Sequence, residues 1–308
     1  MSATHRYGLL WLLLWLSLGC EAQLSHYSLK FKLSKRNFVD SIAISFEHGR
    51  LLLPVTIGGR TYRFMLDTGA SQTTIYDDTP IEGAHGIGFI VSYDAQNRPD
   101  TVDKVALPTM QIGTLQLQRC QAVVQQRLGR RKDIDGILGF DLVCKGLLMK
   151  IDVRNNLLVI TDRRSLFKHE AGTDVRYELR RHVPYVDVSP FSDHSERVLF
   201  DTGSPHFFML NKQHFDSLEQ QYPERIQPLV LERKTGRRSR SHYGAEPVGE
   251  IITLQLDSLC IGTLLLPDAP CETTRLGSHI GSALLERASV VFFPKRRTLR
   301  LQPYRSSP

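Results

Sequence analysis

The sequence lacks several patterns that are typical of particular protein classes. It has neither Cys-x-x-Cys nor His-x-x-x-His spacing, so we expect no metal site, and nothing in it implies a separate cofactor. Strong helical periodicity is scarce throughout. The net charge of +7 comes from short basic clusters without interleaved aromatic residues, at 127–132, 233–240 and 295–300. Such clusters favour solvated loops, so we expect no nucleic-acid partner.

A hydrophobic run long enough to span a bilayer is also missing. The apolar run Leu9–Leu18 is too short for a comfortable span. Arg6 precedes this run and small residues follow it, which is typical of an export signal. The sequence therefore predicts a signal peptide over residues 1–22. It also predicts an exported protein, which is periplasmic, secreted, or a lipoprotein of the outer membrane or cell surface.

Two processing outcomes remain open for this signal. Cleavage after Ala22 would leave Gln23 as the new N-terminus. Alternatively, the segment 16–20 resembles a bacterial lipobox, although its Ser and Leu are swapped relative to the usual order. Lipidation of Cys20 would then tether the protein to a membrane.

Only five cysteines occur, and four of them follow the predicted signal. They lie two in each half of the chain, at Cys120, Cys144, Cys260 and Cys271. An exported compartment permits disulfides, and the simplest of the three pairings joins Cys120 to Cys144 and Cys260 to Cys271. Buried free thiols are the alternative.

The hydrophobic pattern predicts a mainly β protein. Apolar and polar residues alternate over 27–33 and 42–46, and the apolar run 51–57 precedes the turn residues Gly58 and Gly59. With 308 residues, 41% of them apolar, the chain is large enough for two lobes with cores of their own.

Two short stretches place an acid on a tight turn after an apolar strand. They are Asp67-Thr68-Gly69-Ala70, after the run 62–66, and Asp201-Thr202-Gly203-Ser204, after the run 197–200. One Asp-Thr-Gly turn is common turn chemistry. Two copies, separated by almost half the chain, indicate a functional pair.

The halves repeat one another around these turns. Four pairs of segments correspond: 53–55 with 183–185, 112–115 with 261–264, Ile137-Leu138-Gly139 with His279-Ile280-Gly281, and the predicted strands 148–152 with 290–293. His279 breaks the apolar pattern of the second triplet. We interpret it as a structural hydrogen-bonding residue.

Two Asp-Thr-Gly turns and two apolar triplets ending in Gly, over roughly residues 50 to 302, resemble the aspartic proteases of the pepsin and retropepsin type. The short lobes are similar to a retropepsin dimer fused into one chain, a type found among bacterial proteins. The resemblance implies two related β-barrel-like lobes with a cleft between them, each triplet bracing an Asp turn. It gives an N-terminal lobe over 23–162, a linker over 163–176 and a C-terminal lobe over 177–308.

The resemblance also assigns roles to the two turns. Asp67 and Asp201 are expected to share one proton and to hold a water between them. The ionised acid takes a proton from this water, and the protonated acid binds the carbonyl under attack. Thr68 and Thr202 are expected to bond across the lobe interface, while the backbone N–H groups at Gly69 and Gly203 face the carboxylates.

The residue after each Gly differs between the turns. Ser204 has a hydroxyl that can donate to a nearby carboxylate, whereas Ala70 has none. We therefore expect Asp201 to ionise more easily than Asp67.

Proteases of this type close a β-hairpin flap over the substrate. The candidates are Tyr93, close to the stretch 86–89 in the first half, and Tyr243 in the loop 237–250 of the second half.

The sequence thus predicts a monomeric, exported aspartic endopeptidase that cleaves extended segments of a peptide or protein substrate. One alternative is a catalytically silent, retropepsin-like module that binds peptides or proteins. Another is a dedicated processing protease with few targets. Intact acids on both turns favour an enzyme, because a binding module has no need of two mutually repelling carboxylates.

Overall fold

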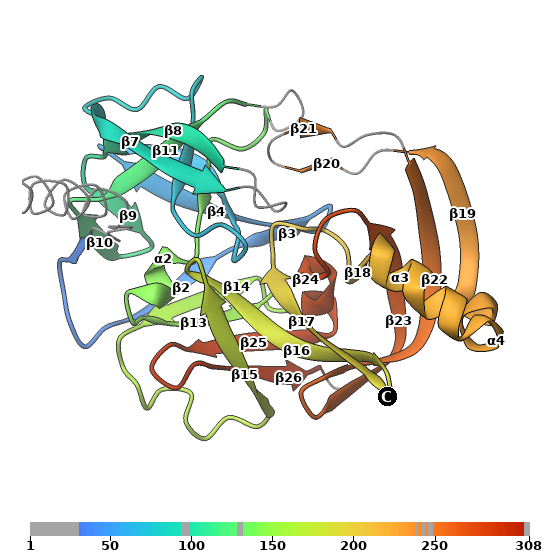
Figure 1. Ribbon diagram of the computed structural model, residues 1–308. Helices are drawn as coiled ribbons and strands as arrows, with labels where there is room; N and C mark the ends of the chain where they lie inside the picture. The colour runs from blue at the N-terminus through green and yellow to red at the C-terminus, as the bar shows by residue number, and fades with distance from the viewer. Residues whose placement is uncertain are drawn as a thin grey trace, which may run out of the picture. The chain divides into compact units, whose positions relative to one another are not determined.

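The computed structural model describes residues 31–93, 99–127, 132–237, 240–241, 244–245 and 249–304. Within these residues the protein is mainly β, as predicted, and most strands belong to two large sheets (Figure 1). No helix of this part has the length and apolar character needed to cross a membrane. The predicted signal, including Cys20, lies outside the described residues.

The first sheet has 11 strands in the described part of the chain, all from the first half. They are β1 (Lys32–Leu33), β3 (Ser45–Glu47), β4 (Arg50–Ile57), β5 (Arg60–Leu66), β6 (Thr74–Tyr76), β7 (His85–Tyr93), β8 (Pro99–Ala106), β9 (Met110–Ile112), β10 (Leu115–Gln118), β11 (Gln121–Gln125) and β12 (Gly136–Leu138). The turn after β4 contains Gly58 and Gly59, and both have a positive φ, as a tight hairpin requires.

The second sheet has 13 described strands and draws on both halves. They are β2 (Val39–Ala43), β13 (Leu148–Asp152), β14 (Leu157–Thr161), β15 (Thr173–Arg180), β16 (Val183–Phe191), β17 (His194–Asp201), β18 (Phe208–Asn211), β19 (Val230–Arg237), β22 (Gly249–Ile261), β23 (Leu264–Thr274), β24 (His279–Gly281), β25 (Ala288–Phe293) and β26 (Thr298–Pro303). A further pairing of β22 with β16 closes the strands from β16 to β22 into a barrel. A separate two-stranded sheet pairs β20 (Arg240–Ser241) with β21 (Gly244–Ala245).

Helices are few and short in the described residues. They are α2 (Asp141–Cys144), α3 (Lys212–Gln221), α4 (Pro223–Ile226) and the 3-10 helices η1 (Gln227–Leu229) and η2 (Ser282–Glu286). The side chain of Asn211 caps α3 by accepting bonds from the backbone N–H groups of Gln213 and His214.

The two halves are joined by strand pairing. Strand β13 of the first half pairs with β25 of the second, with Met149 opposite Phe292 and Ile151 opposite Val290. One hydrophobic core cluster contains residues from both halves. The expected linker 163–176 stays a prediction, and β15 begins inside it.

The internal repeat is present in the structure. In the first half β12 runs parallel to β5 and antiparallel to β6. In the second half β24 runs parallel to β17 and antiparallel to β18. Each triplet strand therefore lies beside the strand that ends at an Asp turn. Aromatic rings pack below this arrangement, where Phe292 contacts Phe140 and Phe200 at centroid distances of 5.0 and 5.7 Å.

Candidate active site

The ends of strands β5 and β17 bring Asp67 and Asp201 close together. The hydroxyl of Thr68 donates to the carbonyl oxygen of Phe200 at 2.6 Å and accepts from the backbone N–H of Thr202 at 3.0 Å. The hydroxyl of Thr202 does the same in the opposite direction, with the carbonyl of Leu66 at 2.9 Å and the N–H of Thr68 at 3.0 Å. Both threonines are fully buried. The two turns are therefore fixed against each other by four reciprocal hydrogen bonds.

The glycine of each turn lies directly against the acid of the other turn. A Cβ added to Gly69 would stand 2.5 Å from Oδ1 of Asp201, and a Cβ added to Gly203 would clash with the carboxylate of Asp67. Such distances leave no room for a side chain. The two carboxylates consequently face each other across the pair of glycines, and both acids are half-buried.

Backbone N–H groups surround the carboxylates, as expected from the glycines. Oδ1 of Asp67 accepts from the N–H groups of Gly69 and Ala70, at 2.8 and 3.1 Å. Oδ1 of Asp201 accepts from the N–H of Gly203 at 2.9 Å. Bonds of this kind stabilise the ionised form of a carboxylate.

The triplets brace the turns from below. The N–H of Asp67 donates to the carbonyl of Leu138, and Phe140 N–H donates to the carbonyl of Ala70. In the second half Ser282 N–H donates to the carbonyl of Ser204 at 2.7 Å. A Cβ on Gly139 or Gly281 would collide with backbone oxygens of the braced turn, so these positions need glycine for close approach.

The hydroxyl of Ser204 has a partner that the sequence did not predict. Its hydroxyl is hydrogen-bonded to Nε2 of His279 at 3.0 Å, and Nδ1 of His279 bonds the carbonyl of Gly277 at 2.9 Å. His279 is thus a structural hydrogen-bonding residue, as predicted. The expected donation from Ser204 to a carboxylate stays a prediction.

The first half provides a flap-like hairpin. Strands β7 and β8 pair over their full length, from His85 opposite Ala106 to Tyr93 opposite Pro99. Three exposed side chains, those of Phe89, Val91 and Tyr93, alternate along β7 and so share one face. Tyr93 therefore lies on a hairpin of the expected kind. Tyr243, the other flap candidate, lies outside the described residues.

Tyr93 reaches the second half of the molecule. The guanidinium of Arg181 lies 3.9 Å from the centroid of the Tyr93 ring. Arg181 and His182 form the turn between β15 and β16, and both have a positive φ, which is costly for residues other than glycine. The thiol of Cys144 donates to the carbonyl of His182 and holds this turn to α2. Sequence patterns gave no sign of this turn, because Arg-His is not a turn signal.

Tyr185 is a further residue near the acids that sequence reasoning did not single out. Burial raises its pKa, the charges of Arg180 and Arg181 oppose this, and the charge of Asp201 adds to it. Tyr185 therefore lies within electrostatic reach of Asp201. The signal was available in the repeat, where Tyr185 occupies the position of Val55 in the first half.

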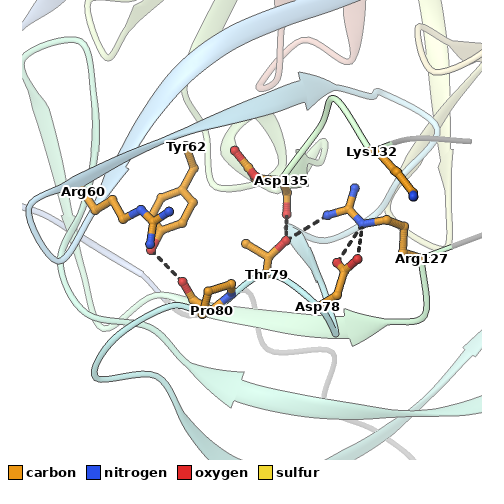
Figure 2. A pocket seen from close by; sticks show the side chains of 8 residues that line it. All are labelled: Arg60, Tyr62, Asp78, Thr79, Pro80, Arg127, Lys132 and Asp135. Atoms are coloured by element: carbon orange, nitrogen blue, oxygen red, sulfur yellow. Dashed lines mark hydrogen bonds and ion pairs between the residues drawn. The ribbon is translucent and has the colours of Figure 1, made fainter. Parts of the chain in front are cut away.

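A separate hollow of about 420 Å³ does not involve the acids (Figure 2). Arg127 makes several hydrogen bonds in this hollow. Its guanidinium donates to the carboxylate of Asp78 at 2.7 Å, to Oγ1 of Thr79 at 3.0 Å and to the carbonyl of Ile134 at 2.5 Å. It also lies over the ring of Tyr76 at 4.4 Å. These bonds tie the chain after β6 to the segment before β12, which is a structural task. The lining residues are Arg60, Tyr62, Asp78, Thr79, Pro80, Arg127, Lys132 and Asp135.

The four described cysteines are free thiols. Register explains why Cys260 and Cys271 do not pair: Cys271 lies opposite Leu254, six residues from Cys260 on β22. This corresponds to about 20 Å along the strand, whereas a disulfide needs Cα atoms within about 7 Å. Burial raises the pKa of Cys120 and of Cys144 to about 12, so both stay protonated and unreactive.

Comparison with known proteins agrees with this geometry. Residues 53–142 match the family model described as aspartyl protease. The aspartic proteinase from Irpex lacteus is 14% identical with a TM-score of 0.57, over 86% of this chain and 97% of that one. Basic 7S globulin from soybean is 9% identical with a TM-score of 0.52, over 86% of this chain and 94% of that one. No curated protein sequence matches the chain. The chain has the aspartic protease fold, as a single polypeptide with two lobes, each carrying one Asp-Thr-Gly turn.

Proposed function

We propose that the chain is an aspartic endopeptidase in which Asp67 and Asp201 activate a water for attack on a peptide bond. The observation that carries the proposal is the interlocked pair of turns, in which each glycine lies against the acid of the opposite turn. We assign Thr68 and Thr202 the task of holding the two turns together, with no part in the chemistry. The aspartic protease fold supports this proposal.

The chemistry follows from the proximity of two acids. Two adjacent carboxyls hold one proton between them, because ionising both would place like charges together. The ionised acid accepts a proton from the water as it attacks the carbonyl carbon. The protonated acid donates a hydrogen bond to the carbonyl oxygen, which gains negative charge. No covalent intermediate with the protein is required.

The decisive experiment is cleavage of a diverse peptide mixture from about pH 3 to pH 8, followed by mass spectrometry. Asp67→Asn and Asp201→Asn are each expected to lower the cleavage rate by roughly 10²- to 10⁴-fold. Asp257→Asn, on an exposed site of β22, makes the same chemical change away from the turns and should cleave normally. A folded wild type that cleaves nothing would contradict general peptidase activity. It would favour a processing enzyme with few targets or a peptide-binding module.

We also propose export, which rests on the sequence of residues 1–22 alone. The mature N-terminus distinguishes the two routes. Mass spectrometry of protein from bacterial membranes and culture medium should find either a lipid-modified peptide that begins at Cys20 or an unmodified peptide that begins at Gln23. Cys20→Ala should abolish the lipid mass in the first case and change nothing but the residue in the second. An N-terminus at residue 1 in the cytoplasm would contradict export.

A further inference from the structure

The turn between β3 and β4 of the first half lies against the second acid turn. Its two residues, His48 and Gly49, both have a positive φ, as a two-residue hairpin turn requires. A Cβ added to Gly49 would stand 2.5 Å from Cβ of Pro205, which directly follows Asp201-Thr202-Gly203-Ser204 in the chain. The first half therefore contacts the segment that leads away from the second acid.

Ser282 joins these two turns by hydrogen bonds. It directly follows the triplet glycine Gly281, and it is fully buried. Its hydroxyl donates to the carbonyl oxygen of Gly49 and lies 2.9 Å from the carbonyl oxygen of Ser204. One hydroxyl proton between two carbonyl oxygens makes a three-centre bond. Because the backbone N–H of Ser282 also donates to the carbonyl of Ser204, at 2.7 Å, this residue links the second acid turn to the hairpin turn of the other half.

The repeat has a counterpart of this contact in the second hairpin turn. The turn between β15 and β16, Arg181-His182, also has a positive φ at both residues. The carbonyl oxygen of His182 accepts from the thiol of Cys144, on the helix that follows the first triplet. A thiol is a weaker donor than a hydroxyl. Cys144 lies five residues after its triplet glycine, whereas Ser282 is next to its own. Of the two contacts, the one made by Ser282 has the stronger donor and the shorter connection to its triplet.

We propose that Ser282 is a positioning residue for Asp201: it uses the β3–β4 turn of the first half to hold the second acid turn in place. This role rests on the proposed peptidase function. Its physical basis is that a displacement of either turn breaks a hydrogen bond to a fully buried hydroxyl, which carries a desolvation cost. A displacement of about 1 Å at a reacting group can lower a rate by about 10²-fold.

The test compares the kinetics of Ser282→Ala and Ser289→Ala with those of the wild type. Ser289, on β25, is also a buried serine, and its hydroxyl donates to the side chain of Gln302 at 2.9 Å. Ser282→Ala should lower kcat roughly 10-fold and leave KM within about twofold, because the acid is displaced while the substrate-binding surfaces remain. Ser289→Ala removes a buried hydrogen bond elsewhere and should keep the kcat of the wild type. Equal kcat values in the two variants would overturn the proposal.

Ser282→Cys serves if Ser282→Ala does not fold. A thiol keeps nearly the shape of the hydroxyl and donates more weakly. The kcat of this variant should therefore fall below the wild-type value, again with KM within about twofold. A wild-type kcat in Ser282→Cys would overturn the proposal.

A second measurement does not depend on cleavage. Hydrogen exchange of backbone amides in the full chain, followed by NMR, reports on each acid turn separately. In Ser282→Ala the N–H groups of Gly203 and Ser204 should exchange about 10-fold faster, with a smaller change at Gly69 and Ala70. An equal change at the two turns, or none, would overturn the proposal even if the peptidase is active. If the wild type cleaves nothing, the peptidase function fails, and the exchange rates still decide whether Ser282 holds the second turn.

Discussion

At the scale of single residues, Thr68 and Thr202 decide where the two acids stand. Each hydroxyl uses its proton and a lone pair on backbone groups of the other half, in a fully buried place. A buried backbone group that loses such a partner bears its full desolvation cost. The acids themselves contribute charge, and the threonines contribute the geometry.

Replacing Thr68 by Val should therefore destabilise the protein. The substitution leaves the carbonyl of Phe200 and the N–H of Thr202 without partners, and we expect the free energy of unfolding to fall by about 2–4 kcal/mol. Thr68→Ser keeps the hydroxyl and should stay within about 1 kcal/mol of the wild type. Urea denaturation measures both variants. Equal stability of the Val and Ser variants would show that these bonds contribute little.

At the scale of elements, the hairpin of β7 and β8 also contacts the second half. Its contact is the ring of Tyr93 under Arg181, a residue held in a strained two-residue turn. Cation–π contacts of this kind contribute about 0.5–2 kcal/mol. A contribution of this size favours contact between the hairpin and the second half and still allows the hairpin to open.

Tyr93→Ala should free the hairpin from this contact. We expect a higher KM for peptide substrates with a smaller change in kcat, and faster hydrogen exchange of the backbone amides in β7 and β8. Tyr93→Phe keeps the ring face over which the guanidinium lies and should resemble the wild type in both measurements. If the Ala and Phe variants exchange equally fast, the contact with Arg181 does not restrain the hairpin.

At the scale of the whole molecule, strand pairing between the halves makes one body out of a repeated sequence. Strand β13 of the first half pairs with β25 of the second half. The aromatic cluster around Phe292 also contains side chains from both halves. Three described histidines, His182, His206 and His279, have lowered pKa values, chiefly because burial disfavours their charged form. Protonation of these histidines therefore changes the free energy of unfolding.

The sign of this effect gives a prediction for stability. In the unfolded chain these histidines take up protons as the pH falls through about 6.5, whereas in the folded protein they do so at lower pH. The unfolded state then binds more protons, so the free energy of unfolding should decrease as the pH falls from about 6.5 to about 5. Urea denaturation at both pH values measures the loss. His279→Ile should make the loss smaller, and an unchanged loss would show that His279 does not titrate in this window.

The sequence by itself was sufficient to predict the features that depend on residues close together in the chain. The acid turns after apolar strands, the glycine triplets and the repeat of Ile112–Leu115 by Ile261–Leu264 are all visible in short stretches, because backbone turns and strand burial depend on neighbouring residues. These stretches were enough to predict a mainly β protein with two aspartic protease lobes.

The tertiary structure decided which distant side chains meet. The hydrogen bond between Ser204 and His279, the contact of Tyr93 with Arg181 and the separation of Cys260 from Cys271 each depend on strand register and packing. The type of a residue determines which hydrogen bonds its side chain can donate or accept, whereas the fold determines which partner it meets. For Ser204, the fold supplies an imidazole from another strand as a hydrogen-bond partner, which its sequence position did not suggest.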